Sequence, residues 1–116
     1  MIYKFRAILD AEEDIFRDFE IEDKASLEEL HHAIKKYVGF QGNEMASFFL
    51  ADDEWIQGEE IALLNMHEKK KGQRLMSNTA LKTILSEENN KLIYVYDFLN
   101  LWTCYVELMK IDKKER

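Results

Sequence analysis

The stretch that most constrains the fold is residues 92–111, which are rich in β-branched and aromatic side chains. Such side chains fit the pleated, half-buried surface of a sheet. Asn100 stands near the middle of the stretch, and asparagine is one of the few residue types that tolerate the positive φ of a tight turn. We therefore expect two long antiparallel strands joined near Asn100. A hairpin this apolar is not stable alone, so further strands or a helix must cover it.

Two more hairpins are predicted upstream. Residues 2–10 alternate between apolar and polar side chains, the period of a half-buried strand, and residues 15–21 follow as the antiparallel partner. The third hairpin is formed by residues 45–50 and 55–57, on either side of the acidic turn 51–54. All three hairpins place strands that are neighbours in the sequence side by side in the sheet.

Ser26 begins the most clearly marked helix. Its hydroxyl can accept a hydrogen bond from the Glu29 backbone while the Glu29 carboxylate reaches back to the Ser26 backbone, which is a capping box. Apolar residues then recur at helical spacing until Gly39, where we expect the helix to end.

The remaining segments complete an α+β fold. Residues 61–66 have no decisive period, and we assign them to an extended edge segment. Asn78 or Thr79 can cap a short helix that runs to Leu85. The order of elements is then β-β-α-β-β-α-β-β in a single domain over residues 1–116. Because hairpins dominate, the sheet should be mostly antiparallel with the helices packed against it.

Composition limits the classes of function. The formal net charge is -7, so the average field repels nucleic-acid phosphates and anionic lipid, and nucleic-acid binding would need a segregated basic patch. The single cysteine, Cys104, excludes an intrachain disulfide and favours a reducing, cytoplasmic location. We expect no signal peptide and no membrane span, because charged and polar residues interrupt the most apolar window.

Arg17 and Asp97 are the most unusual charged residues, because each is embedded in an apolar strand pattern. A buried, unpaired charge is costly, so each would need a partner. The structural alternatives are an ion pair between the two, or an Arg17 side chain that extends to solvent. The functional alternative is that Asp97 lines a pocket and binds a ligand or a metal ion.

His31 and His32 are neighbours on the first predicted helix and point about 100° apart, so they cannot both ligate one metal ion. We interpret His31 as a hydrogen-bonded histidine at the edge of the core, because no convergent set of metal ligands accompanies it. No metal or cofactor is expected. The chain also lacks the motifs of nucleophilic, phosphate-binding and metalloprotease sites, so we expect no enzymatic activity.

One basic run comprises Lys69, Lys70, Lys71 and Arg74. Together with the lysine-rich carboxyl end it could present a local phosphate-binding patch. Short lysine runs in loops are usually only solvated, and no nucleic-acid-binding motif accompanies this one. The patch is therefore a secondary hypothesis.

Several short motifs are spread over nearly the whole chain: Ile15-Phe16-Arg17, Leu30-His31 with Ala33 and Ile34, Gly39-Phe40, and Tyr94-Val95-Tyr96-Asp97-Phe98 ahead of Trp102. In this order they resemble the Ri-plasmid open-reading-frame-three-like family. The resemblance implies a small α+β domain of the kind found on plasmids, transposons and bacterial or archaeal chromosomes. No activity is established for the family, and the label resolvase-like, given to some members, is unsupported.

This chain departs from the family pattern after Phe98. Where relatives usually continue with Gly-Asp, it has Leu99 and Asn100, and where they follow the tryptophan with an acidic residue and a histidine, it has Thr103 and Cys104. A site built from those polar groups elsewhere in the family would be degraded here.

These observations favour a non-catalytic interaction module that presents an exposed aromatic surface or a sheet edge to a protein partner, with Trp102 a candidate member of that surface. One alternative is a nucleic-acid accessory protein of a mobile element, suggested by the resemblance and by the basic run. A ligand-binding domain around Asp97 is the least favoured alternative. A homo-oligomer stays open.

Overall fold

The computed structural model of the chain describes residues 1–13, 15–64 and 74–113. Its elements, in chain order, are β1 (Ile2–Leu9), β2 (Ile15–Glu22), α1 (Leu27–Ile34), η1 (Lys35–Gly39), β3 (Ala46–Ala51), β4 (Gln57–Ala62), η2 (Met76–Asn78), α2 (Leu81–Ile84), β5 (Lys91–Tyr96) and β6 (Trp102–Asp112). The segment η1 is a π-helical turn that continues α1, and η2 is a 3-10 turn. None of the helices in these ranges has the length and apolar content needed to span a bilayer.

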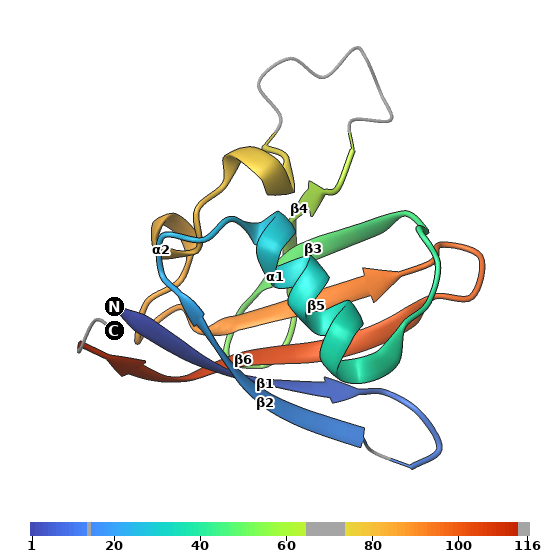
Figure 1. Cartoon of the computed structure of the whole chain (residues 1–116), viewed down its shortest axis with the longest axis horizontal. Coiled ribbons are helices and arrows are strands. Elements are labelled where there is room, and N and C mark those ends of the chain that lie inside the picture. The colour runs from blue at the N-terminus through green and yellow to red at the C-terminus, as the bar shows by residue number, and fades with distance from the viewer. Residues whose placement is uncertain (14, 65–73, 114–116) are drawn as a thin grey trace.

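The six strands form one antiparallel sheet in the order β2-β1-β6-β5-β3-β4. The mostly antiparallel α+β fold predicted from the sequence is confirmed. The observed order of elements differs from the predicted one by the two extra helical turns, η1 and η2. Strands β1 and β6 come from opposite ends of the chain and pair side by side in the sheet (Figure 1), so Ile2 faces Asp112.

Helix α1 lies across one face of the sheet (Figure 1). It begins with the expected capping box: the Glu29 backbone N–H donates to Ser26 Oγ at 3.2 Å, and the Ser26 backbone N–H donates to Glu29 Oε2 at 2.8 Å. Its apolar stripe, Leu27, Leu30 and Ile34, is fully buried. Each such side chain contributes about 1.5–3 kcal/mol when it leaves water, so the stripe fixes the helix to the sheet.

The face of the sheet that α1 covers carries a row of facing residues that crosses all six strands. The row is Ile15, Leu9, Cys104, Tyr94, Phe48 and Ile61. Its members from Leu9 to Ile61 are buried. Cys104 is thus a small core residue, and burial raises the pKa of its thiol to about 12.

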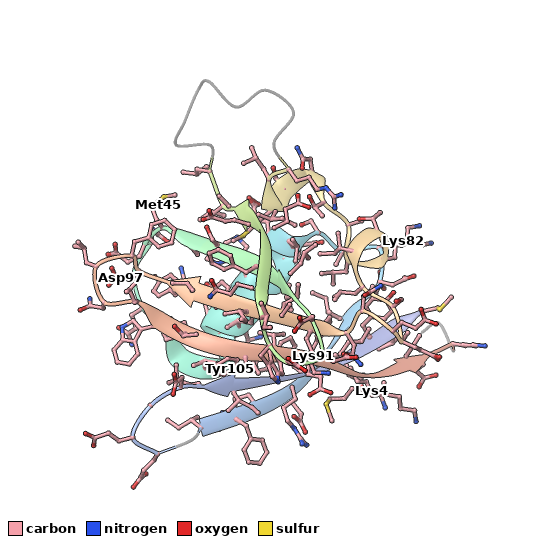
Figure 2. The ribbon with its side chains drawn as sticks, turned by 180° about the vertical axis from the view of Figure 1, so that it is seen from behind. Lys4, Met45, Lys82, Lys91, Asp97 and Tyr105 are labelled. Carbon is pink, nitrogen blue, oxygen red and sulfur yellow. The ribbon has the colours of Figure 1, made fainter. Side chains whose placement is uncertain are left out.

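The opposite face, which we call the open face, is seen in Figure 2. Neighbouring residues of a strand point to opposite faces of a sheet. The residues next to those of the first row therefore form a second row on the open face: Phe16, Ile8, Tyr105, Ile93, Phe49 and Glu60. The open face is therefore apolar through its middle as well.

The β3–β4 hairpin coils over the open face, so that β4 runs in front of the sheet in Figure 2. Two local features bend it. The register of the pair shifts between Phe49 and Ala51, and such irregularities bend and twist a strand. Gly58 permits a close approach, because a Cβ atom there would lie 3.2 Å from the Leu50 carbonyl oxygen.

The turn between β3 and β4 places Trp55 on the open face. Its ring packs edge-to-face on Tyr105 with centroids 5.2 Å apart, and Lys91 Nζ lies 5.7 Å from the Trp55 ring centroid. The prediction that Trp55 opens the second strand of this hairpin is wrong: the residue has φ 64° and sits in the turn, and β4 begins at Gln57.

The run 61–66 is predicted to be an extended edge segment, and its first residues, Ile61 and Ala62, do belong to the edge strand β4. Residues 65 and 66 lie outside the described residues. One other local prediction is wrong. The short helix α2 is not capped by Asn78 or Thr79: Asn78 Oδ1 accepts from the Leu75 backbone N–H and the Thr79 hydroxyl donates to the Leu75 carbonyl. Both side chains thus stabilise η2, and the residue before α2 is Ala80.

Candidate functional site

The open face is hollowed beside the turn that joins β5 to β6. The hollow has a volume of about 420 Å³, and we call it the turn groove. It is lined by Phe49, Val95 and Thr103 from strands β3, β5 and β6, by Gln57 and Glu60 from β4, and by Phe98 and Leu101 from the β5–β6 turn. The groove is therefore bounded by the coiled β4 strand and by the turn.

Asp97 organises the β5–β6 turn. Its backbone N–H donates to the Met45 carbonyl at 2.8 Å, and its own carbonyl accepts from the backbone N–H groups of Asn100 at 3.1 Å and Leu101 at 2.6 Å. Its carboxylate accepts from Asn100 Nδ2 at 2.6 Å and from the Leu99 backbone N–H at 3.1 Å. These hydrogen bonds, the one from Asn100 foremost, lower the pKa of Asp97. Asp97 thus connects the turn to Met45, before β3, and also stabilises the turn internally.

Two residues of this turn adopt the left-handed conformation. Asp97 has φ 62° and Leu101 has φ 53°. An aspartate side chain tolerates this region because it can form local hydrogen bonds, whereas a leucine side chain cannot form any. The conformation costs an L-residue roughly 1–2 kcal/mol. In this conformation Leu101 lines the turn groove.

The turn also displays an unusual amount of apolar surface. Phe98 is 41% exposed, Leu99 93% and Leu101 61%. Hairpin turns normally carry polar or glycine residues, and clustered exposed apolar side chains mark interaction sites. In Figure 2, Asp97 marks this turn at the edge of the molecule, next to Met45.

Arg17 and Asp97 do not come together. Arg17 is exposed on the edge strand β2, and its Nη1 donates to the Phe16 carbonyl at 2.8 Å. Asp97 lies in the turn rather than inside a strand, and it does not line the turn groove. The premise that both charges are buried is wrong, because an edge strand leaves one side of Arg17 in solvent.

His31 joins α1 to the centre of the sheet. It is 2% exposed, and its Nδ1 lies 2.6 Å from Tyr94 Oη. Burial, assisted by the nearby charges of His32 and Lys35, lowers the pKa of His31 to about 4. Burial also raises the pKa of Tyr94, so its hydroxyl keeps the proton and can donate to the neutral imidazole.

Trp102 lies at the margin of an aromatic cluster on the helix-covered side of the sheet. The Phe40 ring stacks on Tyr96 with centroids 4.9 Å apart, and the Trp102 ring lies 6.2 Å from Phe40. The Tyr96 hydroxyl lies within hydrogen-bonding distance of the Gln41 and Gly42 carbonyls. Trp102 is thus partly exposed, but it faces away from the turn groove.

The basic run is only partly placed. Lys69, Lys70 and Lys71 lie outside the described residues. Arg74 is exposed, and its Nε lies 3.5 Å from Glu59 Oε2. Within the described ranges, no three His, Cys, Asp or Glu side chains are grouped as metal ligands would be.

Sequence reasoning missed the turn groove. The turn lies near Asn100 as predicted, but its positive φ values fall on Asp97 and Leu101 and not on Asn100. The apolar character of the turn itself had no place in the prediction. The signal was Phe98, Leu99 and Leu101 around a single asparagine, since apolar residues in a solvent-exposed turn are unfavourable unless they have a function. The contribution of β4 to the groove had no such signal.

The chain is similar in sequence to one protein family and in fold to a known structure. The family model described as plasmid pRiA4b ORF-3-like protein matches residues 1–116. A crystal structure of a protein of unknown function from Methanosarcina mazei Go1 superposes with a TM-score of 0.76 at 20% sequence identity, covering 99% of this chain and 65% of that one. The chain thus spans 65% of the length of that protein, and the likeness shows the fold alone. No curated protein matches the chain.

Proposed function

The chain belongs to the plasmid pRiA4b ORF-3-like family, and for this member we propose a non-catalytic role as a protein-interaction module. Its binding surface is the turn groove together with Leu99. The observation that supports this most strongly is that Phe98, Leu99 and Leu101 expose 41%, 93% and 61% of their surface beside a groove with an apolar floor. Burying such side chains against a partner is worth about 1.5–3 kcal/mol each.

The strain at Leu101 supports the same proposal. Glycine or asparagine would adopt φ 53° at a lower cost, so leucine at this position weakens folding. Backbone strain of this kind concentrates at binding and catalytic sites. An apolar contact between Leu101 and a partner would explain why a leucine occupies this strained position.

The turn is also prepared for binding. Asp97 takes part in five hydrogen bonds, with Met45, Leu99, Leu101 and twice with Asn100. A surface that is already ordered loses less conformational entropy when a partner binds. The apolar side chains are therefore presented in one geometry.

The other two candidate functions have less support. A nucleic-acid surface would need basic side chains, whereas the charged residue among those lining the groove is Glu60. A ligand site at Asp97 would have to compete with the hydrogen bonds that its carboxylate already makes within the turn. We also infer a cytoplasmic location, which the free, buried thiol of Cys104 supports.

Site-specific photo-crosslinking tests the proposal. A benzoyl-phenylalanine introduced at Leu99 should crosslink to a protein of the source cell, and the same label at Tyr37, exposed near the end of the α1–η1 helix, serves as the control. Excess unlabelled wild-type chain should suppress the Leu99 crosslink, whereas the Leu99→Ser/Leu101→Ser variant should not. Equal crosslinking from both positions, or equal competition by both chains, would refute the proposed surface.

A further inference from the structure

We infer that the segment bound in the turn groove is basic as well as apolar: a short stretch of a protein partner in which lysine or arginine flanks an apolar anchor. This inference rests on the proposed function and adds the chemistry of the partner. It follows from the distribution of charge on the open face.

Two acidic residues flank the groove. Glu60 lines it, and Glu60 Oε2 accepts a hydrogen bond from Ser47 Oγ at 2.7 Å. The Asp10 backbone N–H donates to the carbonyl of Thr103, another lining residue, at 2.9 Å. Asp10 directly follows β1, and from the alternation of the strand we infer that its side chain lies on the side of Ile8, the open face. Neither acidic side chain forms an ion pair with any residue that the structure describes.

Arg6 and Lys91, two basic residues of the open face, are already engaged with acidic partners. Arg6 donates from Nε and Nη2 to the Asp18 carboxylate at 2.8 and 3.0 Å. Lys91 Nζ lies 3.8 Å from both Asp53 Oδ1 and Glu107 Oε2. Neither cation lines the groove, and both have acidic partners beside them.

The charge at the groove is therefore negative, whereas Lys4 and Lys110, which face each other across β1 and β6, lie at the opposite end of these strands. The set of lining residues combines four apolar or aromatic side chains, Phe49, Val95, Phe98 and Leu101, with Glu60 and without a lysine or an arginine. An apolar side chain of the partner can enter the groove, and a neighbouring cation can pair with Glu60 or Asp10. Complementary charge of this kind steers association and selects partners.

The same charges disfavour the other occupants of an apolar groove. A second copy of the chain would bring a formal net charge of -7 and its own acidic groove against this one. Nucleic acid and anionic lipid carry the same sign as Glu60 and Asp10, so they would be repelled at this position. A basic segment of a protein is the occupant that the surface fits.

A peptide titration tests the inference. The probes are three short, blocked peptides of equal length in which leucine alternates with lysine, with glutamine or with glutamate. Binding is followed by amide chemical shifts of the isotope-labelled protein. We expect the lysine peptide to shift signals of Val95, Leu101 and Thr103, to bind at least about fivefold more tightly than the glutamine peptide, and to weaken as salt is added.

Charge-removing variants locate the effect. Glu60→Gln keeps an acceptor for Ser47, and Asp10→Asn keeps the shape of the side chain. Each should weaken the lysine peptide about two- to fivefold, as expected for a partly exposed ion pair. The matched control is Glu88→Gln, an exposed residue before β5, which should leave binding unchanged. The dispersed amide spectrum of each variant shows whether it is folded.

The outcomes separate the two proposals. Equal binding of the lysine and glutamine peptides at the groove would overturn the basic partner while the interaction surface stands. Shifts confined to residues outside the groove, or no binding by any peptide, would also overturn the inference, and the Leu99 crosslink then decides the proposed function by itself.

Discussion

Removing the hydroxyl of Tyr94 should destabilise the protein without changing its packing. The change Tyr94→Phe leaves no cavity, but it deprives His31 Nδ1 of the partner that lies 2.6 Å away. His31 is only 2% exposed, so water cannot replace the lost hydrogen bond. A buried polar group without a partner costs about 1–3 kcal/mol, and we expect the free energy of unfolding to fall by that amount.

A double-mutant cycle isolates the contact. His31→Leu alone should also be destabilising, because it leaves the Tyr94 hydroxyl without its partner. The double variant His31→Leu/Tyr94→Phe removes both polar groups, and such paired replacement is close to neutral. Its loss of stability should therefore be smaller than the sum of the two single losses by about 1 kcal/mol or more.

The pH dependence of stability reports the burial of His31 between α1 and the sheet. The pKa of His31 is about 4 in the folded protein and about 6.5 in the unfolded chain. Between these values the unfolded state binds more protons, so His31 reduces stability as pH falls from about 6.5 to about 4, by about 3 kcal/mol in total. Below pH 4 it adds no further loss. The variant His31→Leu should lack this component.

Urea unfolding followed by circular dichroism at several pH values measures both effects. The difference in stability between wild type and His31→Leu should shrink as the pH is lowered through this window. Single losses that add up, together with parallel pH profiles for wild type and His31→Leu, would refute the idea that the His31–Tyr94 contact joins α1 to the sheet.

Three further substitutions test the local chemistry by urea unfolding. Leu101→Asn should stabilise the fold by about 1 kcal/mol, because asparagine tolerates φ 53°, and it should weaken partner binding; a loss of stability would contradict the strain argument. Ser26→Ala should cost about 1 kcal/mol, because the cap of α1 is lost; no change would show that the capping box contributes nothing. Gly58→Ala should destabilise the β3–β4 hairpin, because its Cβ would lie 3.2 Å from the Leu50 carbonyl oxygen, and amide shifts should change along the groove; a neutral result would show that the backbone adjusts freely.

Local chemistry explains what could be predicted from the sequence. The capping box of Ser26 and Glu29 is written in residues three apart, so the start of α1 could be located without knowledge of the rest of the fold. The alternation in residues 2–10 likewise identified β1 and its buried side. These signals need only neighbouring residues.

The features that were missed depend on distant parts of the chain. The pairing of β1 with β6 joins the two ends of the sequence, and no short pattern reports it. Arg17 looked buried because its neighbours are apolar, but β2 is an edge strand and its side chains are mostly exposed. The turn groove needs β4 to coil toward the β5–β6 turn, which follows from the register shift after Phe49.

The most direct test of the interaction surface is the affinity of the protein captured at Leu99. Calorimetry should compare the wild-type chain with the Leu99→Ser/Leu101→Ser variant, with Tyr37→Ser as the control for an exposed apolar residue elsewhere. Losing two apolar contacts should weaken binding at least about tenfold, while the free energy of unfolding is maintained and the control binds normally. An affinity of the double variant within about twofold of the wild type would contradict the account.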